Sequence, residues 1–340
     1  MAFSHIYKNY TYYLLGDIMI KKMLFRKITV ATSILLVILM LYLIPANKEE
    51  IDLNKNQKLE YIYPNDLEVI YLLDNNNFLS RTKINVNNKN EISKAIDLIE
   101  GLTINGKKKD IIPNGFKSLL PMDTKVLDLK LNDGILKIDF SKEFNSIKKE
   151  YEEKLIESLA YTLTSINGID KIEIYVEGNK LTNLPNSKVL LPEYIDKSYG
   201  INKKYELTSL SDIDSYTVYY VFNYNDEVYY TPVTKYINNQ NQDKVKIIID
   251  ELSTSLIYES NLMSYLDTNV KLLDYELTDN VIKLNFNDVI LSDITNNLIL
   301  EEVMYTIGLS LCDELDIENV IFKVNNEEIS TFSLKSLDLK

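Results

Sequence analysis

Carboxylates are the side chains of this sequence that could do chemistry. It holds 50 acidic residues against 37 basic ones, and a suitably spaced pair of carboxyl groups is what a glycoside hydrolase uses. The candidates are Asp123, Asp139 and Glu143. Asp139 lies on an apolar strand that recurs later with Asn285 in its place, and Asp123 recurs as Asp267 just before a strand, where Asp commonly forms turns. We therefore expect structural roles for these carboxylates.

Histidine and cysteine occur once each in the sequence. His5 lies on the N-terminal side of a long apolar run, and Cys312 is expected to be a buried, small apolar residue. Ser-His-Asp and Cys-His sites therefore lack their base, and zinc sites built on two or three histidines cannot form. The glycines occur singly, without a phosphate-binding loop, and no motif marks a Ser-Lys dyad. We predict no catalytic residue, no cofactor site and no metal site.

The apolar residues that must position any site form a pattern that occurs twice. A strand, a hairpin and a closing strand recur at offsets of 149, 146 and 148 residues. The matched sets are Val69, Tyr71 and Leu73 with Val218, Tyr220 and Phe222; Leu127 to Phe140 with Leu273 to Phe286; and Ile172, Ile174 and Val176 with Val320, Phe322 and Val324. Solenoid repeats have periods of roughly 20 to 50 residues, so this longer period predicts two whole domains.

Two amphipathic helices complete each copy. Their apolar stripes run from Ile92 to Leu102 and from Ile156 to Leu163 in the first copy, and from Val245 to Leu256 and from Leu300 to Leu311 in the second. Asn90 and Asp243 are placed to cap the first helix of each copy, Gly168 is placed to end the second helix of the first copy, and polar turns at 132–134 and 278–280 close the hairpins. This order predicts an α+β fold of two repeated βαββαβ domains, each a small antiparallel or mixed sheet with two helices on one face.

A transmembrane helix is predicted near the N-terminus. Between Lys27 and Lys48 lie 20 uncharged residues, which as a helix would span about 30 Å, the thickness of a bilayer core. Basic residues precede this run and acidic residues follow it, so the positive-inside rule places the N-terminus in the cytosol and the two domains outside. A cleaved signal peptide is the alternative, although the run is longer than usual and no clear cleavage site follows it.

The chain therefore divides into seven segments. They are a short cytoplasmic segment (1–27), the transmembrane helix (28–46), a polar spacer (47–64), the first domain (65–181), a linker (182–213), the second domain (214–329) and a tail (330–340). The first 50 residues carry a net charge of +3, which leaves −16 for the remainder. Nucleic-acid binding needs a concentrated positive patch, so this balance disfavours it.

A tyrosine-rich stretch, 216–236, begins the second copy. Tyr219, Tyr229 and Tyr230 alternate around the apolar set of this strand. Tyrosines on the surface of a sheet can stack on sugars or anchor a protein partner. We expect instead a half-exposed strand without a binding role.

The first copy also resembles a known domain family. The segments LLPMDTKVLDLKLNDGILKIDFSKEF and VEGNKL are similar to the GerMN domain of sporulation and spore germination proteins, over residues 65–181 and more divergently over 214–329. The second copy lacks the counterparts of Pro121 and Gly134. The resemblance implies a non-enzymatic envelope protein of spore-forming bacteria, in which the domain helps to assemble a protein complex between two membranes.

Anchor, tandem and resemblance together lead to one expected function. We expect a single-pass cell-membrane protein whose extracytoplasmic domains act as a protein-binding scaffold in sporulation or germination. A module that binds or modifies peptidoglycan is the alternative, motivated by the spare carboxylates and tyrosines. A second copy of the chain is a further candidate partner, because an exposed edge strand can pair with a neighbour.

Overall fold

The computed structural model describes residues 21–30, 32–33, 35–36, 67–86, 90–225, 227–238, 242–254 and 261–334. The chain separates into two units, Met1–Tyr61 and Ile62–Lys340. In the first unit, residues 21–30 are helical. No helix within the described residues is both long and apolar enough to cross a membrane. Most of the expected span at 28–46 and all of the spacer at 47–64 lie outside the described residues, so the structure gives the transmembrane helix no support.

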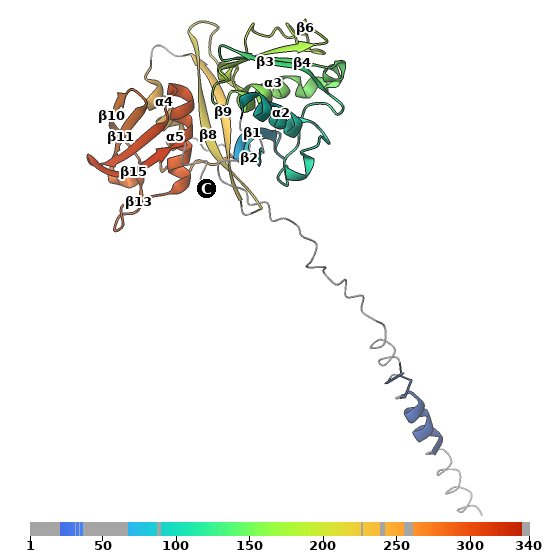
Figure 1. The fold of residues 1–340 in the computed structure, drawn as a ribbon. Coiled ribbons are helices and arrows are strands. Elements are labelled where there is room, and N and C mark those ends of the chain that lie inside the picture. The colour runs from blue at the N-terminus through green and yellow to red at the C-terminus, as the bar shows by residue number, and fades with distance from the viewer. Residues whose placement is uncertain are drawn as a thin grey trace, which may run out of the picture. The chain divides into compact units, whose positions relative to one another are not determined.

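A five-stranded sheet at the centre of the second unit draws strands from both repeats (Figure 1). Its strands are β1 (Leu67–Leu73), β2 (Leu79–Asn85), β7 (Lys204–Glu206), β8 (Ile213–Tyr224) and β9 (Glu227–Asn238). β1 and β2 form one antiparallel hairpin, and β8 and β9 form another. The hairpins join where Arg81 of β2 pairs with Tyr230 of β9, and β7 runs parallel to β9. The two repeats therefore share one sheet.

Each repeat also has a four-stranded outer sheet. The first consists of β3 (Val126–Asn132), β4 (Ile135–Phe140), β5 (Lys171–Val176) and β6 (Asn179–Lys180), and the second of β10 (Leu272–Thr278), β11 (Val281–Phe286), β14 (Asn319–Val324) and β15 (Glu327–Ser333). β4 pairs with β5, and β11 with β14, in parallel, whereas the other neighbours are antiparallel. The outer sheets are therefore mixed, which is one of the two arrangements, antiparallel or mixed, that the sequence predicts. A small hairpin of β12 (Leu291–Asp293) and β13 (Leu298–Ile299) lies beside the second.

The helices lie between the central sheet and the outer sheets (Figure 1). They are α2 (Glu91–Leu102) and α3 (Glu152–Leu163) in the first repeat and α4 (Lys244–Thr254) and α5 (Glu301–Leu315) in the second. Short 3-10 helices occur at Lys109–Ile111, Lys142–Ser146, Lys149–Tyr151, Lys197–Tyr199 and Asp288–Ile290. α3 contacts both β1 and β5, and α5 contacts both β8 and β14, so these helices are covered on two faces.

The prediction of a single small sheet per domain is therefore wrong. The first strand of each repeat does not join the sheet of its own repeat but forms a hairpin on the opposite face of the helices. The burial of α3 gives the physical reason, because every residue from Leu155 to Leu163 is buried. A helix that is buried nearly all round needs a second layer, whereas a single apolar stripe needs only one.

The register of the first strand also differs from the prediction. The backbone N–H of Tyr71 donates to Thr162 Oγ1, at 3.0 Å between N and O, and that of Tyr219 donates to Ser310 Oγ at 2.9 Å. Tyr71 therefore corresponds to Tyr219, 148 residues on, and not to Tyr220. β8 is buried without interruption from Tyr216 to Phe222. It therefore shows no alternation of apolar and polar residues from which its alignment with β1 could be determined.

Several local predictions are confirmed and others are corrected. Asn90 caps α2, since its side chain accepts the N–H of Ser93 at 2.7 Å, and Asp243 accepts that of Val245 at 3.0 Å at the start of α4. α3 already ends at Leu163, so Gly168 lies in the turn that follows rather than at the helix end.

The segments predicted as linker and tail take part in the fold. The linker at 182–213 contributes β7, and its buried apolar residues belong to the core. These are Leu184, Ile195 and Ile201. The tail expected from residue 330 begins inside β15, which continues to Ser333. These segments were predicted to lie outside the domains because most of their residues are polar, although a few apolar residues in them are buried in the core.

Candidate functional site

The acidic candidates hold turns in place. Asp139 accepts the backbone N–H of Gly178 with both carboxylate oxygens at 3.0 Å, and the side-chain oxygen of Asn285 accepts that of Asn326 at 2.9 Å. The two residues therefore anchor the same turn after the closing strand of each repeat. Because an uncharged amide does this equally well in the second copy, the charge of Asp139 serves no evident chemistry.

The remaining candidates have local partners of their own. Asp267 accepts the N–H of Asn269 at 2.7 Å within a turn, and Asp123 lies in a turn with a φ of 67°. A hydrogen bond from Ser141 lowers the pKa of Glu143. No cluster of three or more His, Cys, Asp or Glu side chains within the described ranges is arranged to hold a metal ion.

Cys312 is buried, with 3% of its surface exposed, as expected for a small apolar residue. Burial raises the pKa of its thiol to about 12. Since the thiolate is the reactive form, this side chain is chemically inert at neutral pH.

The three tyrosines of the aromatic stretch do not share a solvent-exposed face. Tyr219 is 1% exposed and Tyr229 is 8% exposed. Tyr230 is half-buried and stacks on Tyr305, with ring centroids 5.3 Å apart. The strand is therefore buried more deeply than the half-exposed strand that we expected, and Tyr219 and Tyr229 offer no surface on which a sugar or a partner could stack.

Equivalent residues of the two repeats meet in a buried polar cluster. The hydroxyls of Tyr71 and Tyr219 lie 2.9 Å apart, and Tyr219 donates to Asp313. The other carboxylate oxygen of Asp313 lies 2.6 Å from Lys197 Nζ. Contact between a residue and its own counterpart is what a two-fold interface produces, so the repeats are related by an approximate two-fold axis.

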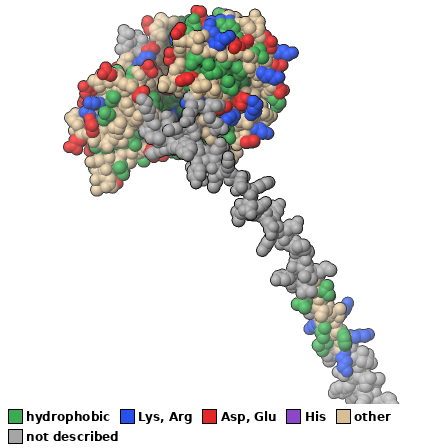
Figure 2. All heavy atoms as spheres, viewed as in Figure 1, with side chains coloured by type: hydrophobic (Ala, Val, Ile, Leu, Met, Phe, Trp, Pro, Cys, Tyr) green, Lys and Arg blue, Asp and Glu red, His purple; other side chains and the backbone are tan. Residues whose placement is uncertain are grey.

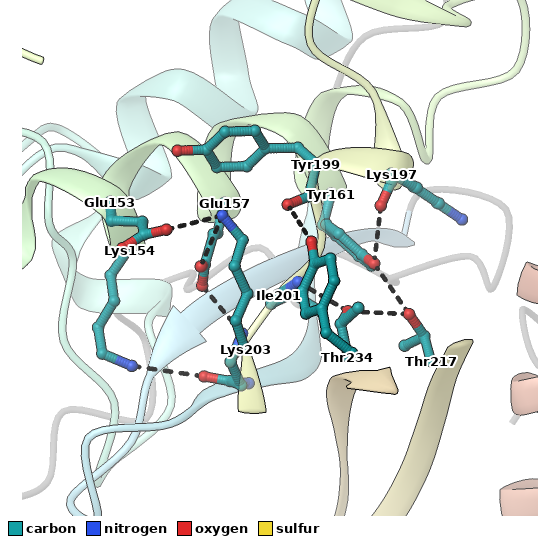
Figure 3. A network of polar contacts seen from close by, with 12 residues as sticks. Glu153, Lys154, Glu157, Tyr161, Lys197, Tyr199, Ile201, Lys203, Thr217 and Thr234 are labelled. Carbon is teal, nitrogen blue, oxygen red and sulfur yellow. Dashed lines mark hydrogen bonds and ion pairs between the residues drawn. The ribbon is translucent and has the colours of Figure 1, made fainter. Parts of the chain in front are cut away.

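Residues of the predicted linker complete this junction (Figure 3). The hydroxyl of Tyr161 donates to the carbonyl of Lys197 at 3.1 Å. The side-chain amide of Asn202 donates to the carbonyls of Leu79 and Pro232, at 2.8 Å each, and so bridges the hairpins of both repeats. With their buried groups paired in this way, the two repeats form one compact unit.

Glu157 is a buried carboxylate at the edge of the junction. Its carboxylate accepts the N–H of Asn202 at 2.9 Å and lies 3.7 Å from Lys203 Nζ (Figure 3). Burial raises the pKa of Glu157 from 4.5 to about 7, and the nearby Lys203 opposes this only in part. The folded chain therefore holds the proton of this carboxyl more tightly than the unfolded chain does.

We expect Glu157→Gln to remove part of the pH dependence of stability. Between pH 4.5 and 7 the folded state holds this proton more tightly than the unfolded state, so wild-type stability falls as pH rises through that range. The stability of the wild type relative to the variant should drop by about 2 kcal/mol from pH 5 to pH 7.5. Urea unfolding at both pH values measures this, and two parallel pH profiles would contradict the assignment.

An apolar groove lies on the first repeat, between α2, the loop 103–122 and the edge strand β3. It consists of two adjoining cavities of about 670 and 830 Å³, which share Ile104, Asn105 and Met122. Figure 2 shows hydrophobic side chains gathered over this part of the repeat. The apolar side chains that line the groove and are 37–50% exposed are Ile92, Ile96, Ile104, Met122 and Leu127. We call this surface the first-repeat groove.

The sequence prediction missed this groove. Ile92 and Ile96 belong to the apolar stripe of α2 and were expected in the core, yet they are 37% and 38% exposed. A row of exposed apolar side chains in a concave surface is typical of a protein-binding site. The width of the apolar stripe on α2 could have indicated the groove. The buried face of this helix is already filled by Ala95, Leu98, Ile99 and Leu102, so the additional apolar residues remain on the surface.

Comparison with known proteins gives a consistent result. A family model described as "Germane: Sporulation and spore germination" matches residues 69–182 and 217–330. The spore germination protein GerM of Bacillus subtilis (strain 168) is 32% identical over 289 residues, which cover 83% of this chain and 78% of that protein. The solved structure of the tandem GerMN domains of the Bacillus subtilis sporulation protein GerM superimposes with a TM-score of 0.70 at 31% identity, over 77% of this chain and 91% of that one.

Proposed function

Because the chain belongs to the Germane family of sporulation and spore germination proteins, we propose that it acts as a protein-binding scaffold in one of these processes. The observation that carries the proposal is the first-repeat groove. Its exposed apolar side chains lie on a repeat whose helices pack between two sheets. A preformed apolar surface binds a partner without the entropy loss of ordering itself first. We propose no catalytic activity for the chain.

We also propose that the scaffold is anchored in the cell membrane, with both repeats on the extracytoplasmic side. The run of 20 uncharged residues after Lys27 supports the anchor, and Lys21, Lys22 and Arg26 before it support the orientation. In this arrangement the spacer at 47–64 holds the tandem off the bilayer. The partners are then other proteins of an envelope or intermembrane complex.

Complementation of a gene deletion in the source organism tests the function. Deletion should lower the yield of heat-resistant spores or block their germination, and the wild-type gene should restore it. A variant with Ile96→Glu and Leu127→Asp should fail to restore it, because it places charges in the groove at side chains that are 38% and 50% exposed, and circular dichroism of the variant checks that it still folds.

The matched control replaces apolar residues that are exposed elsewhere. Leu190 and Leu210 are 77% and 92% exposed and do not line the groove, so Leu190→Glu with Leu210→Glu should restore spores like the wild type. Normal spore yield and germination in the deletion strain would refute the sporulation role. Full complementation by the groove variant would show that the groove is not the binding surface.

A further inference from the structure

One end of the first-repeat groove is rimmed by lysines. The cavity of about 670 Å³ has an apolar floor and carries Lys109, Lys117 and Lys148 around it. All three lysines are exposed, although they come from separate parts of the chain. The apolar floor consists of Leu73, Ile112, Phe116, Leu119, Ile147 and Tyr151. Apolar walls with a few convergent polar groups are typical of binding sites of this size.

The charge of this rim is unbalanced. No Asp or Glu side chain lines the cavity, although the chain as a whole has a net charge of −13. Within the described part of the chain, no carboxylate lies within ion-pair distance of Lys109, Lys117 or Lys148. Lys107, which lines the second cavity, is paired with Glu100 at 2.7 Å, whereas the three lysines around the first cavity have no such pair, so their charge favours an anionic partner.

One position of the lysine rim can be compared directly between the two repeats. Leu73 pairs with Lys117 through an isolated bridge, and in the second repeat Val221 pairs with Met263 in the same way. Met263 therefore occupies the position of Lys117, and it is 41% exposed. The same backbone thus presents a cation in one copy and an apolar side chain in the other.

The shape of the surface favours a length of polypeptide over a small molecule. The lysine-rimmed cavity continues past Ile104 and Met122 into the second cavity of about 830 Å³, which runs along α2 and β3. Among the strands that the structure describes, β3 lies at the edge of its sheet, with no strand paired to its outer side. An extended segment can lie along such an edge while its side chains enter the cavities.

We propose that the lysine-rimmed end of the first-repeat groove binds a segment of a partner protein in which apolar side chains are flanked by Asp and Glu. The apolar side chains fill the cavity, and the carboxylates pair with Lys109, Lys117 and Lys148. This inference rests on the proposed scaffold function and specifies the chemistry of its partner. The second repeat, which lacks the cation at Met263, does not bind this segment.

Selection from a random 12-residue peptide library displayed on phage tests the proposal. The full chain in detergent is the target, and a Lys109→Glu, Lys148→Glu variant serves for counter-selection. We expect the selected peptides to share apolar residues flanked by Asp or Glu. One such peptide, measured by fluorescence anisotropy, should bind the variant about tenfold more weakly than the wild type, because ion pairs are replaced by repulsion.

A charge-matched control separates a local effect from a general one. Lys246→Glu with Lys271→Glu makes the same change of charge at exposed positions of the second repeat and should leave peptide affinity unchanged. The proposal is overturned if no acidic motif is enriched, if both variants weaken binding equally, or if the lysines instead bind vesicles of anionic phospholipid while no peptide is selected. Spore counts are independent of this assay, so a spore defect without an acidic motif would leave the scaffold standing and refute only its partner chemistry.

Discussion

Replacing Asp313 by alanine should lower the free energy of unfolding by about 3–4 kcal/mol, because one carboxylate satisfies two groups at the junction of the repeats. Asp313 accepts the hydroxyl of Tyr219 and pairs with Lys197 at 2.6 Å, and its own side chain is 12% exposed. Its removal leaves the hydroxyl of Tyr219 and the partly buried ammonium of Lys197 without the acceptor that Asp313 provides. Lys197 is 34% exposed, which keeps the expected loss below the upper end for a fully buried pair.

Equilibrium urea unfolding of the compact unit, residues 62–340, measures this effect. Asp128→Ala is the matched control, since Asp128 pairs with Lys130 where both side chains are more than half exposed, and it should have no measurable effect. Equal behaviour of the two variants would mean that Asp313 does not hold the junction together.

Replacing Gly308 by alanine should also destabilise the protein, by about 2–3 kcal/mol. In a helix interior this change normally stabilises by about 1 kcal/mol, but a Cβ at Gly308 would overlap the ring of Phe332 on β15. Phe332 is 4% exposed and cannot move without disturbing the outer sheet. The steric cost therefore exceeds the gain in helix propensity.

A double-mutant cycle identifies the cause. In a Phe332→Ala background, Gly308→Ala should become neutral or stabilising, because the ring that it strikes is gone. Gly101→Ala in α2 is the comparison, since a Cβ there meets only the flexible ends of Ile84 and Ile70 at 2.9 and 3.0 Å. A loss at Gly308 that persists without the Phe332 ring would point to another source of strain.

The sequence predicted the outer layers well and the central sheet poorly. The hairpins and closing strands alternate apolar and polar residues, and Asn90 is a recognisable cap. β2 was missed because its buried positions include hydroxyl side chains: Ser80 is 0% exposed and contacts Thr231 across the junction. Hydrophobic periodicity does not recognise a strand whose inward face is partly polar, and the hydroxyl that contacts Ser80 belongs to a residue 151 positions away in the sequence.

The candidate site was beyond sequence reasoning for a related reason. Lys109, Lys117 and Lys148 are spread over 40 residues of chain, and they surround one cavity only because the loop 103–122 packs against the segment 146–151 in the fold. Ile96 has the spacing of a core residue, and nothing in the local pattern marks it as 38% exposed. The exclusion of histidine-based and cysteine-based catalysis needed no structure, because it depended on composition alone.

The contact between Tyr71 and its counterpart Tyr219 has a consequence for stoichiometry. If two separate chains paired in this way, every surface feature would appear twice on the assembly. Here one polypeptide supplies both halves, so one half can change its surface while the shared sheet stays intact, as the exchange of Lys117 for Met263 shows. Within the described residues the lysine-rimmed cavity occurs on the first repeat, so the partner that we propose is expected to bind with a stoichiometry of one to one.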